Sequence, residues 1–168
     1  ISNEVFKATP IIHNELVVRD RLSSMSMNGA TILLNRVFNN SHFKNLGMEG
    51  NPSEFGIYLS LIKSNNLHIK KGDEYVISIE NTKNKSIKTI YDEFLKLIKS
   101  SKEAVNVSDI YAHFVKQPYG IKIGLLPILI GIFFKATEAS CAFYNKDEQG
   151  RESLITEFDQ RVAERLYH

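Results

Sequence analysis

The chain has 168 residues, of which 43% are apolar and 24% are charged, and this composition excludes an intrinsically disordered protein. The net charge is +2, with nine basic and eight acidic side chains in residues 1–84 and twelve and eleven in residues 85–168. Neither half shows the positive excess that is typical of a duplex-binding domain.

The first half begins with two predicted helices. Thr9-Pro10 is expected to open a helix because proline is tolerated in the first turn, and Ile12, Leu16 and Arg19 would then share one face. A second helix is predicted from about residue 29 to residue 39, where Asn39-Asn40-Ser41 ends it. The glycine-containing segment 41–50 is expected to be a loop.

A third helix and a hairpin follow. Asn51 is the expected N-cap, with Pro52 at the first helical position and Glu54 three residues on, as in a capping box. Apolar residues then recur at helical spacing up to Ile62. Residues 67–79, with a turn at 70–73, predict a two-stranded hairpin.

The second half repeats this order of elements. The polar segment 80–85 indicates a linker, and the apolar stripe from Ile87 to Ile98 predicts a long helix. The remaining predictions, in chain order, are a short strand at 105–107, a helix capped by Ser108, a break at 117–120, an apolar helix ending near Ala136, strands at 139–144 and 151–155, and a last helix capped by Thr156.

Helices followed by a two-stranded wing outline a winged-helix module, and this outline occurs twice. We therefore predict an α+β, mainly helical fold of tandem winged-helix-like modules, with one module at residues 1–82 and the other at residues 83–168.

No motif for enzymatic chemistry occurs in the sequence. Neither G-x-x-x-x-G-K-[ST] nor G-x-G-x-x-G is present, and there is no H-E-x-x-H. The histidines lack the spacing of metal ligands; they are His13, His42, His68, His113 and His168. We expect no catalytic residue, no metal and no cofactor.

The segment from Leu125 to Phe134 argues against direct reading of DNA. A reading helix must present polar side chains to base edges, and this segment has no polar face. A helix that is apolar all round is buried, so we expect it to form a packed core. Gly124 and Gly131 would let a neighbouring segment approach closely.

A weaker nucleic-acid hypothesis concerns the first wing. Its lysines would contact phosphates, and the alternative is an ordinary solvated turn and linker. The candidate residues are Lys63, Lys70, Lys71, Lys83 and Lys85.

Asn14, Glu15 and Arg19 mix polar groups with apolar neighbours on the first predicted helix. Glu15 and Arg19 are spaced to pair on that helix. We expect a structural network there, and the alternative is a role in coupling to a partner domain.

The compartment is predicted from the absence of export signals. Cys141 is the only cysteine, which suits a reducing cytoplasm, and we expect it to be a buried small side chain. No secretory signal is visible, and the apolar run 121–134 is shorter than the roughly 20 residues that span a bilayer. A start at Ile1 instead of Met suggests a fragment of a longer protein.

Three segments together resemble a region downstream of the nucleotide-binding core in large bacterial phage-defence ATPases of the BREX type. They are residues 10–23 (PIIHNELVVRDRLS), 54–61 (EFGIYLSL) and 117–127 (QPYGIKIGLLP). Because the phosphate-binding motif is missing here, the resemblance implies a non-catalytic regulatory or interaction region whose partners are other domains or subunits of the parent. A nucleic-acid-binding winged-helix module is the alternative.

Overall fold

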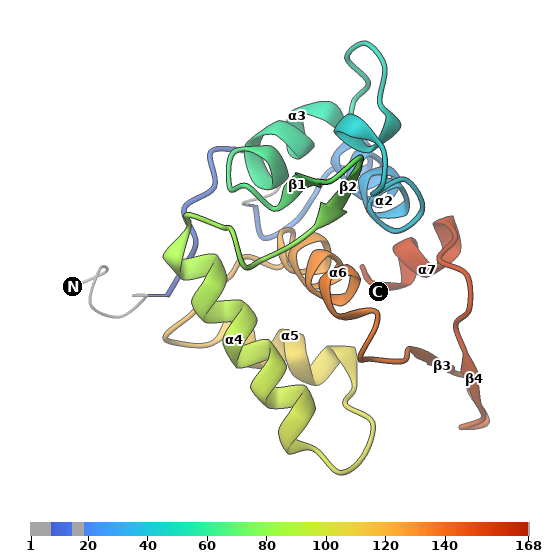
Figure 1. The fold of residues 1–168 in the computed structure, drawn as a ribbon. Coiled ribbons are helices and arrows are strands. Elements are labelled where there is room, and N and C mark those ends of the chain that lie inside the picture. The colour runs from blue at the N-terminus through green and yellow to red at the C-terminus, as the bar shows by residue number, and fades with distance from the viewer. Residues whose placement is uncertain (1–7, 15–18, 168) are drawn as a thin grey trace.

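The computed structural model describes residues 8–14 and 19–167, which form six α-helices, two short irregular helices and two hairpins. Figure 1 shows α6 in the middle of the molecule, with α4 and the β3–β4 hairpin on opposite sides of it. The elements are α2 (Ser24–Asn39), η1 (Lys44–Gly47), α3 (Phe55–Ile57), the π-helix η2 (Tyr58–Lys63), β1 (His68–Lys71), β2 (Glu74–Ile77), α4 (Lys85–Ser100), α5 (Val107–Val115), α6 (Leu126–Thr137), β3 (Tyr144–Lys146), β4 (Glu152–Leu154) and α7 (Gln160–Arg165). The predicted α+β class is confirmed.

The apolar helix α6 is the centre of the core, as its composition predicts. Every residue from Leu125 to Phe134 is buried. Pro127 lies in the first turn of the helix, where a missing N–H leaves no hydrogen bond unmade. The ring of Phe133 lies 5.5 Å from that of Phe94 on α4, and Gly131 packs against the side chain of Leu34 on α2. The segment is therefore closed to base edges.

One hydrophobic cluster contains residues from both predicted modules. Leu33 and Ile62 from the first and Phe94 and Phe133 from the second belong to it. The polar segment 80–85 is also fastened, because Thr82 Oγ1 donates to the carbonyl of Asn65 at 2.7 Å. A division near residue 82 stays a prediction, as does the tandem winged-helix arrangement.

The predicted helix at Thr9-Pro10 is wrong over the part that the structure describes. Residues 9–14 are irregular, and the Thr9 hydroxyl donates to the carbonyl of Tyr119. This segment lies beside residues 118–119, because the amide of Ala8 also donates to the carbonyl of Pro118 at 3.4 Å. A distant partner thus replaces the local helical bonds. Leu16 of the predicted helix lies outside the described residues.

The predicted starts of the next two helices are also wrong. Helix α3 starts at Phe55, and Glu54 binds Arg36 of α2 instead of closing a capping box with Asn51. Helix α2 starts earlier than predicted, at Ser24, with Ser23 as its cap.

The second half shows the same kind of displacement. Val107 begins α5, so residues 105–107 form no strand and Ser108 lies inside the first turn. Asp159 caps α7 through the amide of Val162, whereas Thr156 precedes the helix as part of the connection from β4.

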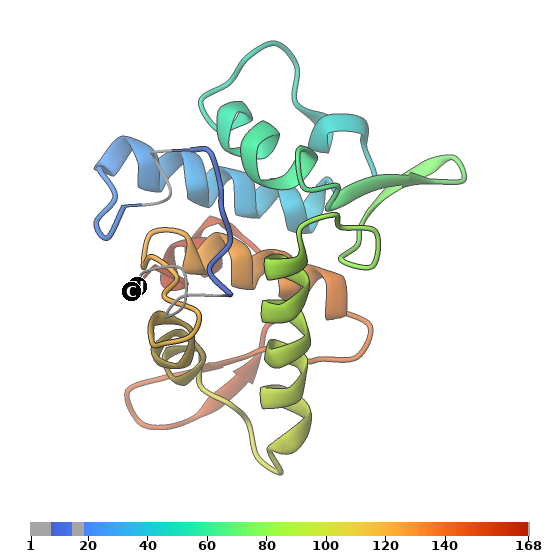
Figure 2. The ribbon, with the colours of Figure 1, turned by 90° about the vertical axis from the view of Figure 1, so that its left-hand side faces the viewer.

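Both predicted hairpins exist, but their strand bounds differ from the prediction: Lys70 and Lys71 belong to β1 and not to the turn, and β3 begins only at Tyr144, the last residue of the predicted strand 139–144. In the first, Lys71 pairs with Glu74 across a two-residue turn in which Gly72 has a φ of 65°. In the second, Tyr144 pairs with Leu154 and Lys146 with Glu152. The β1–β2 hairpin projects away from the helices (Figure 2).

Candidate interaction surfaces

The five candidate lysines occupy two neighbouring places. Lys63 ends η2, and Lys83 and Lys85 flank the start of α4; these ends meet because Asn84 Nδ2 donates to Asn65 Oδ1 at 2.9 Å. Lys70 and Lys71 lie farther out, on β1. We call these five residues the lysine surface.

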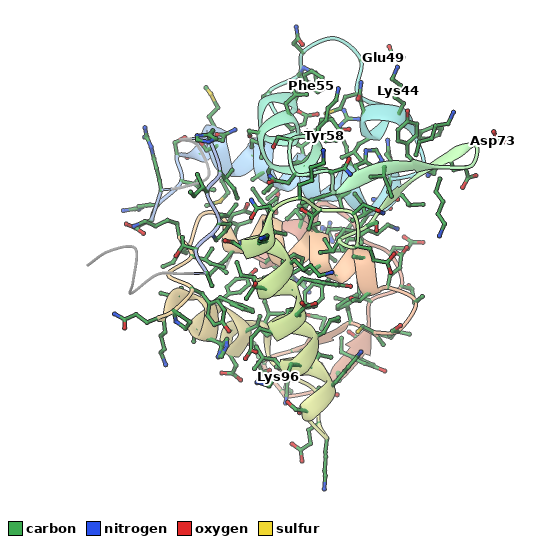
Figure 3. All side chains as sticks on the ribbon, turned by 60° about the vertical axis from the view of Figure 1, so that its left-hand side comes forward. Lys44, Glu49, Phe55, Tyr58, Asp73 and Lys96 are labelled. Atoms are coloured by element: carbon green, nitrogen blue, oxygen red, sulfur yellow. The ribbon has the colours of Figure 1, made fainter. Side chains whose placement is uncertain are left out.

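The lysine surface is open to solvent. All five side chains are exposed, and within the described part of the chain none is within ion-pair distance of a carboxylate. Carboxylates are nevertheless close, because Glu74 faces Lys71 across the hairpin and Asp73 marks its outer end in Figure 3. Residues 60–90 contain six lysines and three acidic residues, so the local charge is moderately positive.

Asn14 and Arg19 both take part in packing of the N-terminal segment. Asn14 Nδ2 donates to Ser60 Oγ on η2 at 2.9 Å, and the carbonyl of Arg19 accepts from the amide of Gly124 at 3.2 Å. Glu15 lies outside the described residues. A coupling role of these three residues stays a prediction.

A buried polar cluster anchors the β1–β2 hairpin, and the sequence did not indicate it. The hydroxyl of Tyr58 lies 3.1 Å from His68 Nδ1, and His68 Nε2 lies 2.8 Å from the carbonyl of Ser41. Since a carbonyl only accepts, Nε2 carries the proton and Nδ1 accepts from Tyr58. Burial lowers the pKa of His68 and raises the pKa of Tyr58 to about 12.

A groove of about 840 Å³ lies between the end of α2, the α6–β3 connection and the β4–α7 connection. We call it the hairpin groove. It is lined by Asn35, Phe38, Asn39, Glu138, Cys141, Ala142, Phe143, Leu154, Ile155, Thr156, Glu157, Phe158 and Asp159.

Aromatic side chains form the floor of the hairpin groove. The rings of Phe38 and Phe158 stack with centroids 3.6 Å apart, and Phe143 packs edge-on against Phe134 of the core. Phe158 is held in place because Asn39 Nδ2 donates to its carbonyl at 2.8 Å and Asn35 Nδ2 does so at 3.3 Å. The floor therefore exists without a ligand.

The sequence patterns do not predict this groove, although they contain one signal of it. Residues 138–159 contain six carboxylates and only two cations. They are Glu138, Asp147, Glu148, Glu152, Glu157 and Asp159 against Lys146 and Arg151. That imbalance marks an acidic region, but nothing in the local pattern places it beside α2.

Among the described residues no group of three or more His, Cys, Asp or Glu side chains has the arrangement to hold a metal ion. None of the helices in the described ranges combines the length and apolarity needed to cross a membrane. Comparisons of the chain with protein-family models, curated proteins and solved structures found no match. The resemblance to phage-defence ATPases therefore stays a prediction.

Proposed function

We propose that the chain is a non-catalytic interaction region of a larger bacterial protein, of the phage-defence ATPase kind that its sequence resembles. In this proposal it works in the cytoplasm, is built from two winged-helix-like modules, and packs against other domains or subunits of its parent.

The hairpin groove is the observation that supports the proposal best. Leu154 at its edge is 53% exposed, and the cross-strand neighbour of Leu154, Tyr144, is 54% exposed. A two-stranded hairpin without a third strand is marginally stable in water, so a partner that covers it would stabilise it. Exposed apolar side chains beside a preformed groove are typical of protein-binding surfaces.

Site-specific crosslinking in the full-length parent tests the proposal. A photocrosslinking residue at position 154 is expected to capture another domain or subunit, whereas one at position 96, on the outer part of α4 in Figure 3, is expected to capture none. Deletion of the region should disrupt assembly of the parent. A parent that assembles normally without these residues would contradict the proposal.

Nucleic-acid binding is a second candidate, and the unpaired ammonium groups of the lysine surface favour it. Because α6 is buried, contacts would be made to phosphates and would carry little sequence information. Binding of a DNA duplex at low salt should weaken in Lys70→Ala plus Lys71→Ala, with a smaller salt dependence.

The matched control removes two exposed lysines near the end of α4, Lys99→Ala plus Lys102→Ala. This variant loses the same net charge and should bind DNA as tightly as the unsubstituted 168-residue chain does. No binding at low salt, or equal losses in both double variants, would eliminate the second candidate.

A further inference from the structure

We propose that the hairpin groove binds a basic peptide segment of its partner, in which apolar or aromatic side chains alternate with arginine or lysine. The proposal rests on the interaction role argued above and names the chemistry of the ligand.

The floor of the groove is suited to an apolar anchor. The side-chain amides of Asn35 and Asn39 hold the Phe158 carbonyl, and Phe38 stacks on the Phe158 ring, so binding would not have to order these two rings. Leu154 is more than half exposed and would lose its contact with water when an anchor covers it.

The rim of the groove favours positive charge. Glu138, Glu157 and Asp159 line it, and no basic residue of the described part of the chain does. Lys135, just outside, already occupies one such place, because its ammonium lies 6.0 Å from the centroid of Phe38 and 2.7 Å from Glu138 Oε2. Arginine or lysine side chains of a ligand would therefore meet Glu157 and Asp159, which flank the ring of Phe158 in the sequence.

A second copy of the chain fits the groove less well. Its most positive segment is residues 83–102, with six lysines and two acidic residues, and none of the exposed side chains of this segment is apolar. A separate peptide segment with both apolar and basic side chains matches the aromatic floor and the acidic rim of the groove.

Fluorescence anisotropy of labelled peptides with the 168-residue chain tests the proposal. A peptide of sequence RFRLRFRLR should bind about tenfold more tightly than RGRGRGRGR, which has the same charge and no anchor. An acidic counterpart, EFELEFELE, should not bind. Equal binding of the two basic peptides, or none, would overturn the proposal.

Variants locate the binding on the protein. Leu154→Ser should weaken RFRLRFRLR about tenfold, and Glu157→Lys about fivefold. Val115→Ser and Glu80→Lys are the matched controls, because they make comparable changes at exposed positions outside the groove, and they should bind normally. Far-ultraviolet circular dichroism confirms that each variant is folded. Losses of the same size in controls and groove variants would overturn the assignment.

Two outcomes separate this proposal from the interaction role. If position 154 crosslinks a partner in the parent but the peptides show no selectivity, the interaction role stands and the basic-peptide assignment fails. A concentration-dependent dimer of the chain that Glu157→Lys abolishes would give the groove to a second copy and would also overturn the assignment.

Discussion

Arg36 and Glu54 join α2 to the start of α3 through an ion pair, with Arg36 Nε 2.8 Å from Glu54 Oε1. The Glu54 side chain is only 4% exposed, whereas that of Arg36 is 29% exposed. The carboxylate therefore depends on the guanidinium for compensation of its lost hydration.

Removal of Arg36 alone should destabilise the fold more than removal of both partners. Arg36→Met leaves a buried carboxylate without its cation and should lower the free energy of unfolding by about 3 kcal/mol, measured by urea denaturation. Arg36→Met plus Glu54→Leu should recover part of the loss. The control is Lys96→Met in the pair with Glu93, where Lys96 is 74% exposed and a change of about 0.5 kcal/mol or less is expected. An unchanged free energy of unfolding in Arg36→Met would show that Glu54 is hydrated in solution.

The close approach at Gly124 should make this position intolerant of a side chain. A Cβ placed there would lie 2.7 Å from the carbonyl oxygen of Arg19, a backbone atom that accepts from the Gly124 amide. We expect Gly124→Ala to cost about 2 kcal/mol of unfolding free energy.

Gly56→Ala is the matched control, because no described atom lies within 4 Å of its added Cβ and the residue is helical. It should be neutral or stabilise by up to about 1 kcal/mol. Equal thermal midpoints for the two alanine variants would contradict the predicted contact.

His68 should make the stability of the fold depend on pH below neutrality. Its pKa in the folded protein is lowered from 6.5 by burial, and this effect is partly opposed by the hydrogen bond to Ser41. The unfolded chain thus binds the proton more readily, so the contribution of His68 is complete above pH 6.5 and is lost as the pH falls through the folded-state pKa.

Urea denaturation between pH 5 and pH 8 measures this effect, in steps of roughly half a unit around the ordinary histidine pKa. His68→Gln should reduce the decrease in unfolding free energy below pH 6.5 relative to the unsubstituted chain. His42→Gln, at an exposed histidine in the neighbouring loop, should not. If unfolding free energy depends on pH in the same way for the unsubstituted chain and His68→Gln, His68 is not the origin of the pH dependence.

The hydroxyls of Tyr111 and Tyr167 should respond differently to removal. Tyr111 donates to the carbonyl of Leu166 at 2.7 Å, so Tyr111→Phe should cost about 1 kcal/mol. The hydroxyl of Tyr167 is buried with no hydrogen-bond partner in the described structure, so Tyr167→Phe should be neutral or stabilising. Thermal unfolding compares them, and a larger loss for Tyr167→Phe would indicate a partner in solution.

The elements that could be predicted are those whose pattern is complete within a short segment. The apolar stripe of α4, the continuous apolar run of α6 and the two hairpins all follow from local periodicity and turn residues. The predicted caps at Asn51, Ser108 and Thr156 failed because several polar residues near each helix start are equally good local choices.

The lysine surface could be predicted from the sequence, whereas the hairpin groove could not. The five lysines are close in sequence, but the groove joins residues 35–39 to residues 138–159. No short-range pattern predicts such a contact, because it depends on how α2 packs against α6.

The amino-acid sequence alone determined the helices α4 and α6, the presence of two hairpins and the burial of residues 125–134, since the local apolar content of that last segment leaves no other stable placement. Only the tertiary structure decided where the N-terminal segment lies and that Phe38 and Phe158 meet in a groove. These features depend on hydrogen bonds and ring contacts between residues far apart in the chain, and their energies arise only when the helices pack.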